Sequence, residues 1–134
     1  MSADEHIKTI QAVYEAFGRG DVQAILGQVT DDVDWATETS STAAPWWGVR
    51  RGKAAVAQFF KDFGSTMEVR EFSPISFAAN HTEVHSVVRF SATARATGKD
   101  ATMHLHHFFR FADGAIAYYR GTEDTLATVA ALSD

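Results

Sequence analysis

The chain has 134 residues, and its 17 acidic and 12 basic side chains give a formal net charge of −5. Chains of this length usually form one domain, so we expect a single domain over residues 1–134. The acidic balance lacks the basic field that attracts nucleic acid or anionic membranes, and no apolar run approaches the ~20 residues of a membrane span. Cysteine is absent, which excludes disulfides and, with a polar N-terminus unlike a signal peptide, favours a cytoplasmic location.

The first part of the sequence has the spacing of amphipathic helices. Ser2 followed by Glu5 is a capping-box pattern, and apolar residues then recur at helical spacing until Gly20. Asp21 can cap a short second helix, which is expected to end near Thr30. The apolar positions of the two helices are Ile7, Ile10, Val13, Tyr14, Phe17, Val22, Ile25, Leu26 and Val29.

The segment 31–37 alternates between apolar and polar residues, which predicts a half-buried strand. Val33, Trp35 and Thr37 share one face of this strand. We expect that face to point inward, because the opposite face carries aspartates.

A Ser/Thr-rich loop at residues 39–49 contains the adjacent Trp46 and Trp47. Two neighbouring exposed tryptophans would be unusual, so we expect this loop to fold over something apolar. Gly52 then opens a third helix. Its apolar residues are Val56, Phe59, Phe60 and Phe63.

From Met67 onward the apolar period changes to two, and Asn-His, Gly-Lys and Asp-Gly turn signals divide the sequence into four strands. Short turns favour an antiparallel meander. Asp124 or Thr122 can cap a last helix. Helices followed by long strands predict an α+β fold, in which a cone-shaped, curved antiparallel sheet packs against the N-terminal helices. The expected ranges are 67–79, 83–96, 101–111 and 115–123 for the strands and 125–132 for the helix.

One strand carries a single polar side chain on an otherwise apolar face. In residues 101–111, His107 shares its face with Met103, Leu105, Phe109 and Phe111. A buried imidazole needs a hydrogen-bond partner, and burial also shifts its pKa. Two interpretations therefore stay open: a core histidine satisfied by a neighbour, or a functional group.

The other face of that strand carries His104 and His106, which are close enough to share a metal ion. A third ligand is missing, since a tight Gly-Lys turn would set His85 about six residues further along, or roughly 20 Å at the rise of a strand. No metal site is therefore expected. With Arg89 and Phe108 beside the histidines, this face is better suited to packing against another subunit.

Several catalytic signatures are absent. The sequence has no Ser/His/Asp order, no Gly-rich phosphate loop, and no HExxH or EF-hand pattern. Nucleophilic hydrolysis, nucleotide chemistry and dedicated metal catalysis are therefore not supported, and no cofactor is expected. Proton chemistry and simple binding are the remaining classes of function.

A series of short motifs covers nearly the whole chain. In order, they are Tyr14-Glu15-Ala16-Phe17-Gly18-Arg19-Gly20-Asp21, Asp31-Asp32-Val33-Asp34-Trp35, Arg51-Gly52-Lys53, Phe59-Phe60, Phe109-Arg110-Phe111-Ala112-Asp113-Gly114-Ala115-Ile116 and Asp124-Thr125-Leu126. This order resembles the SnoaL-like polyketide cyclases and ketosteroid isomerase relatives of the nuclear transport factor 2-like superfamily. The resemblance implies a cone-shaped α+β roll, usually a homodimer, whose pocket holds a steroid, a polyketide or a similar apolar molecule.

The resemblance also assigns candidate residues. In the isomerase branch an aspartate near the end of the first strand moves a proton, and a tyrosine and a protonated acid stabilise the enolate. Thr37 stands at the position of that aspartate and cannot act as a base near neutral pH. His107 stands at the position of the acid, and Val13 at that of the tyrosine, with Tyr14 next to it. In the cyclase branch an aspartate at the end of the last strand handles the proton, and Asp124 matches it, although Asp124 is equally well explained as a helix cap.

The turn at Asp113-Gly114 decides which residue faces His107. A two-residue turn would place Arg120 opposite it, whereas a three-residue turn with a glycine bulge would place Tyr119 there, as the resemblance favours. The expected pocket residues are Tyr14, Phe17, Trp35, Thr37, Phe60, Phe109 and Tyr119, with Trp46 or Trp47 as a lid.

The sequence therefore supports two hypotheses. In the first, the protein binds a small, largely apolar molecule and catalyses isomerisation, cyclisation or hydration, with His107 and Asp124 transferring the proton. In the second, the same fold is a non-catalytic module that binds a ligand or associates through its sheet, and the missing carboxylate on the first strand favours it. The resemblance implies a homodimer, which we expect to form through the outer face of the sheet.

Overall fold

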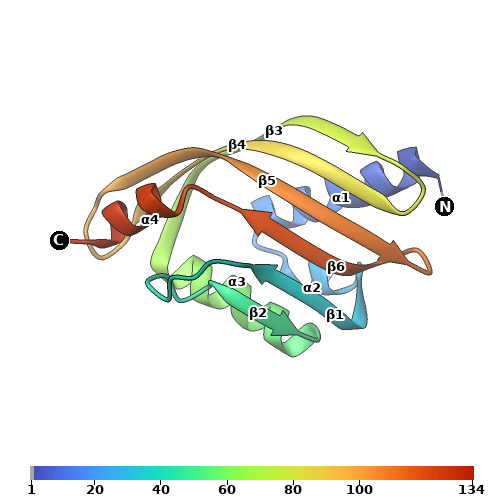
Figure 1. Cartoon of the computed structure of the whole chain (residues 1–134), viewed down its shortest axis with the longest axis horizontal. Coiled ribbons are helices and arrows are strands. Elements are labelled where there is room, and N and C mark those ends of the chain that lie inside the picture. Colours follow the sequence, from blue (N-terminus) through green and yellow to red (C-terminus); the bar gives the residue numbers. More distant parts are fainter. Residues whose placement is uncertain (1) are drawn as a thin grey trace.

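The computed structural model describes residues 2–134. Figure 1 shows a curved sheet with helices α1, α2 and α3 on one side of it and α4 at one end. Within the described residues the elements are α1 (Ala3–Arg19), α2 (Val22–Leu26), β1 (Val29–Thr37), β2 (Gly48–Arg51), α3 (Lys53–Thr66), β3 (Met67–Ala79), β4 (Glu83–Ala94), β5 (Asp100–Ala112), β6 (Ala115–Thr122) and α4 (Thr125–Leu132).

The six strands lie in the order β2-β1-β6-β5-β4-β3 in a single sheet. Strands β3 to β6 pair antiparallel with their neighbours in sequence, as the turn signals predict. The predicted α+β fold is confirmed. Two features were not evident from the pattern: β1 pairs with β6 in parallel, and the short β2 forms an antiparallel pair with β1 at the end of the expected loop.

The predicted caps of the first two helices are present. The Ser2 hydroxyl accepts a hydrogen bond from the Glu5 backbone N–H at 3.1 Å, while the Glu5 carboxylate accepts one from the Ser2 N–H. Gly20 ends α1 in the left-handed region, with φ 71°, which glycine adopts without steric cost. The Asp21 carboxylate accepts a hydrogen bond from the Ala24 N–H and so caps α2.

The second helix is shorter than expected. It ends at Leu26, and β1 begins at Val29, whereas the apolar spacing predicts a helix that continues to about Thr30. The Gln28 carbonyl accepts a hydrogen bond from the Ile116 N–H at 2.9 Å. This contact with β6 draws the chain into the sheet before the helical pattern has ended, so tertiary pairing overrides local spacing.

The hairpin between β5 and β6 turns on two residues. Asp113 and Gly114 have positive φ values, 51° and 81°, which is the backbone of a type I′ turn. The register then shifts between Arg110 and Phe111, where the ladder has an irregularity. A bulge is therefore present, but it lies in the strand and not in the turn.

This register contradicts both alternatives for the residue opposite His107. His107 faces Gly121, while Arg120 faces Phe108 on the outer side of the sheet. Tyr119, the alternative that the resemblance favours, faces Phe109. Both predictions are wrong because each assumes that the turn alone sets the register, whereas the bulge shifts it by one residue more.

Candidate functional site

A cavity of about 90 Å³ lies between the concave face of the sheet and the helices. Its wall is mostly aromatic and aliphatic. Trp47 does not line the cavity, but the other expected pocket residues do. They are Tyr14, Phe17, Trp35, Thr37, Trp46, Phe60, Phe109 and Tyr119. His107 also lines it. Lining residues that the sequence reasoning did not place there are Val13, Ile25, Phe59, Phe63, Phe72, Phe90, Leu105, Gly121, Thr122 and Glu123.

The size of the cavity restricts its ligand. A dry protein cavity of about 150 Å³ holds benzene, and this one is smaller, at about 90 Å³. Its walls are closely packed: the rings of Trp35 and Tyr119 have centroids 4.1 Å apart, and those of Trp46 and Phe63 5.1 Å apart. A compact molecule therefore matches this volume better than a steroid-sized one does.

His107 brings a hydrogen-bonding group to this mostly apolar wall. Its Nδ1 lies 2.7 Å from the Tyr14 hydroxyl oxygen. Burial lowers the pKa of His107 to about 3, and the neighbouring His106 adds to the shift. The imidazole is therefore neutral near pH 7. Among residues 2–134, Nε2 of the ring has no hydrogen-bond partner, so it is free to meet a molecule in the cavity.

Tyr14 joins His107 to Ser86. Its hydroxyl oxygen lies 2.5 Å from Oγ of Ser86, which is itself the residue opposite His107 on β4. Burial raises the pKa of Tyr14, so the phenol stays protonated near pH 7. The three side chains come from α1, β4 and β5, and together they form a short hydrogen-bonded chain beside the cavity.

Because the Tyr14 hydroxyl has one proton, the hydrogen bonds between Ser86, Tyr14 and His107 can be arranged in two ways. If Tyr14 donates to Nδ1 of His107, Nε2 carries the ring proton and presents an N–H donor to the cavity. If Nδ1 carries the proton and donates to Tyr14, which then donates to Ser86, Nε2 presents a lone pair. The site can therefore bind either a carbonyl or a hydroxyl group. Conversion of one arrangement into the other needs rotation of the Tyr14 and Ser86 hydroxyls and transfer of the ring proton of His107 from one nitrogen to the other.

Gly121 has to be glycine for His107 and Tyr119 to lie where they do. A Cβ atom at position 121 would collide with the hydroxyl and ring of Tyr119 and would come within 3.4 Å of the His107 ring. Burial raises the pKa of Tyr119 well above its usual value, so its hydroxyl is protonated and stays a potential donor. The space above Gly121 is thus filled by the Tyr119 ring.

Asp124 and its neighbour Glu123 differ in what their side chains contact. The Asp124 carboxylate accepts a hydrogen bond from the Ala127 N–H at 3.0 Å, so it caps α4, and it does not line the cavity. The geometry therefore does not bring Asp124 together with His107. Glu123 lines the cavity instead. The sequence reasoning missed it, although the alternation Tyr119, Gly121, Glu123 continues the inward face of β6.

A family comparison agrees with this geometry. The family model of the SnoaL-like domain matches residues 10–119. The chain belongs to the SnoaL-like family. No curated protein matches the sequence significantly.

Several solved structures share the fold of this SnoaL-like protein. An NTF2-like protein from Burkholderia xenovorans LB400 is 23% identical, with a TM-score of 0.88 over 99% of both chains. An NTF2-like protein of unknown function from Burkholderia pseudomallei K96243 is 24% identical, with a TM-score of 0.89 over 100% of both chains. TerC, co-crystallised with polyporic acid, is 22% identical, with a TM-score of 0.86 over 97% of this chain and 99% of its own. Identities this low show a common fold.

The loop before β2 closes one side of the cavity of the SnoaL-like protein. Trp46 and Trp47 are 3% and 8% exposed, and their rings pack edge to face with centroids 6.1 Å apart. Both indole N–H groups donate to the same carboxylate oxygen of Glu123, at 3.0 and 2.7 Å. Glu123 therefore ties the loop to the end of β6, with Trp46 against the cavity.

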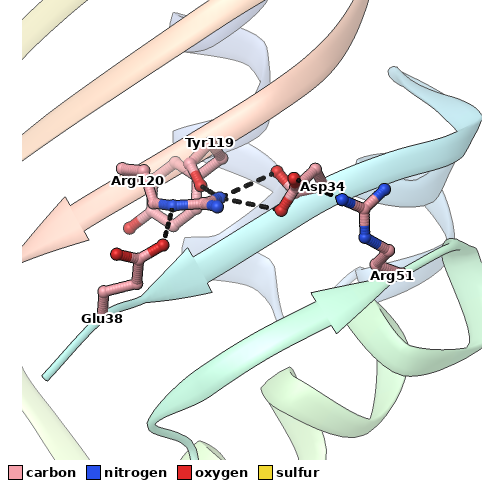
Figure 2. A network of polar contacts seen from close by, with 5 residues as sticks. All are labelled: Asp34, Glu38, Arg51, Tyr119 and Arg120. Atoms are coloured by element: carbon pink, nitrogen blue, oxygen red, sulfur yellow. Dashed lines mark hydrogen bonds and ion pairs between the residues drawn. The ribbon is translucent and has the colours of Figure 1, made fainter. Parts of the chain in front are cut away.

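A charged network of Asp34, Glu38, Arg51 and Arg120 lies on the outer face of the sheet (Figure 2). The Arg120 guanidinium donates to Asp34 at 2.9 Å and to Glu38 at 2.7 Å, and Arg51 pairs with Asp34 at 3.2 Å. Arg120 also lies over the Tyr118 ring. These contacts join β6, β1 and β2, so they support the parallel pair at the point where the antiparallel meander ends.

The outer histidines lie closer together than predicted. His85 faces Phe108, two positions from His106, because β4 ends at Ala94 and the following turn is wider than the two residues assumed. The prediction of six positions is wrong for that reason. Even so, within residues 2–134 no three His, Asp or Glu side chains are grouped to hold a metal ion. None of the described helices has the length and apolar character needed to cross a bilayer.

Proposed function

We propose that this SnoaL-like protein binds a compact, largely apolar molecule in its cavity and promotes proton-transfer chemistry on it through His107. One observation carries the proposal: a neutral imidazole, held by Tyr14 at 2.7 Å, presents its unpartnered Nε2 to an apolar cavity. A hydrogen-bonding group in a site that excludes water interacts strongly with charge that develops on a bound molecule.

The chemical role follows from the low pKa of His107. An imidazole with a pKa of about 3 is a poor base near neutral pH. It is a good neutral donor, because Nε2–H can hydrogen-bond to a carbonyl oxygen and stabilise the negative charge that appears there when hydroxide from the solvent removes the proton of an adjacent C–H bond and becomes water. Tyr14 then donates to Nδ1 and supports this tautomer. Enolate formation of this kind is shared by isomerisation, cyclisation and hydration.

Two substitutions at position 107 test this role. The probe is cyclopentanone in D₂O, whose exchange of hydrogen for deuterium next to the carbonyl reports enolate formation by NMR. We expect the protein to accelerate exchange and His107→Asn to lose about 100-fold or more of the acceleration, as for removal of an oxyanion donor. His107→Gln, whose amide reaches the position of Nε2, should retain more activity than His107→Asn. Equal exchange by all three proteins would contradict the proposal.

Binding without turnover is the second candidate function. The SnoaL-like protein lacks a carboxylate on the inner face of β1, where Thr37 lies opposite Gly121 at the end of the strand. Cyclopentanone that binds in the cavity but exchanges at the rate of the solution would favour this alternative.

We also propose that the protein is a homodimer through the outer face of its sheet. Phe108, Tyr118 and His85 form a cluster of rings on that face, with the Arg110 guanidinium 5.2 Å and 5.1 Å from the Phe108 and Tyr118 ring centres. Aromatic residues and arginine are enriched at protein interfaces. Light scattering at micromolar concentration should give the mass of two chains, and Arg110→Glu should shift it to one. A single-chain mass for the unchanged protein would contradict the dimer.

A further inference from the structure

Glu123 is the ionisable carboxylate that lines the cavity. It lies two residues beyond Gly121, directly after the end of β6, and Gly121 is the residue opposite His107. His107 and Glu123 line the same cavity, so a compact molecule inside it can lie beside both.

Three donors hold this carboxylate in place. Trp46 and Trp47 donate to Oε1 at 3.0 and 2.7 Å, and the Thr128 hydroxyl donates to Oε2 at 2.6 Å. All three donors are buried, with Thr128 1% exposed, whereas Glu123 itself is half-buried. A carboxylate has about four lone-pair sites. Three are occupied, which leaves one acceptor site, on Oε2.

The charge of Glu123 is not balanced by a cation. Glu123 takes part in none of the ion pairs formed by residues 2–134. Its donors are two indoles and a hydroxyl, which are neutral. An anionic ligand would therefore meet repulsion at this end of the cavity, whereas a hydroxyl group could donate to Oε2 in a charge-assisted hydrogen bond.

We propose that Glu123 selects the ligand: the SnoaL-like protein takes a compact, uncharged ring molecule with a hydroxyl group, which donates to the free acceptor site of Glu123, and it rejects carboxylates. This inference rests on the proposed function, because it assumes that the ligand occupies the cavity beside His107. It adds the chemical class of the ligand and a binding residue that no motif indicated.

The test replaces the acceptor Oε2 of Glu123 with a hydrogen-bond donor. Glu123→Gln keeps the size of the side chain, and its amide oxygen can still accept from both indoles, but an NH₂ group replaces Oε2. We expect cyclopentanol to lose at least tenfold in affinity relative to cyclopentanone in this variant, because the alcohol can donate and the ketone can only accept. Cyclopentanecarboxylate should bind the unchanged protein at least tenfold more weakly than cyclopentanol does. In Glu123→Gln the difference in affinity between these two compounds should be smaller.

The tryptophan indole signals in an NMR titration give the readout. The chain has 3 tryptophans, and the Trp46 and Trp47 N–H signals should move when a ligand hydroxyl reaches Glu123. Asp124→Asn is the control, because Asp124 caps α4 outside the cavity, and it should leave all three affinities unchanged. An alcohol-to-ketone ratio that is the same in Glu123→Gln would overturn the role of Glu123 while cavity binding stands. If none of the three compounds bound, both the role of Glu123 and the proposed binding in the cavity would be overturned.

Discussion

Acidification from pH 7 to pH 5 is expected to cost the protein about 2 kcal/mol of its free energy of unfolding through His107 alone. The unfolded chain takes up a proton on this histidine near its ordinary pKa of 6.5, whereas burial lowers the folded-state pKa to about 3. Between these values the unfolded state binds more protons, so stability rises with pH and is lost as the pH falls. The loss continues until the pH approaches 3.

Urea denaturation of the unchanged protein and of His107→Gln at pH 7, 6 and 5 measures this effect. The variant should lose about 2 kcal/mol less than the unchanged protein over that range, because glutamine does not titrate. The range lies above the ordinary pKa values of carboxylic acids, so those groups contribute little to the difference. Parallel pH profiles for the two proteins would show that His107 is not held in an apolar site.

Gly121→Ala is expected to destabilise the fold by about 1–3 kcal/mol or more, as extra methyl groups in other closely packed sites do. The added methyl group would overlap the Tyr119 hydroxyl and ring and press on His107. Both rings belong to the cavity wall, so we also expect loss of cyclopentanol binding. Thermal denaturation and the NMR titration measure the two effects.

Two further substitutions make this prediction specific. Gly64→Ala in α3 has nothing within 4 Å of the added methyl group and should stabilise the protein by up to about 1 kcal/mol, since alanine is the better helix former. Tyr119→Phe removes the nearest colliding atom and should recover part of the loss in the double variant with Gly121→Ala. If Gly121→Ala destabilised the protein no more than Gly64→Ala does, the packing above β6 would differ from that described.

Much of the fold could be predicted because local signals and tertiary packing agree. Ser2 and Glu5 cap α1, Gly20 ends it, and the period-two segments became the long strands. The parallel pairing of β1 with β6 could not be predicted, because it joins segments more than 80 residues apart in sequence and no local turn encodes it. The short β2 was missed for a different reason, because its hydrogen bonds come from β1 across the intervening loop.

The site was only partly predictable. Alternation placed His107 on the apolar face and brought Trp35 and Thr37 to the cavity. It could not identify Tyr14 as the hydrogen-bond partner of His107, or Ser86 as that of Tyr14, because these contacts depend on how α1 crosses the sheet. Asp124 matches the position of the family aspartate, but Glu123, one residue before it, has the inward side chain. The alternation Tyr119, Gly121, Glu123 indicates which of the two neighbours points inward.

The parallel pair of β1 and β6 has a consequence for the growing chain. During synthesis, β1 emerges near the beginning, but the neighbour that it needs on its inner edge is made only when residues 115–122 appear. Until then both β1 and β5 have an unpaired edge, and unpaired edges invite pairing with other chains. Completion of β6 therefore joins the β1–β2 pair to the β3–β5 meander, so a nascent chain that stalls before residue 115 should depend on chaperones to avoid aggregation.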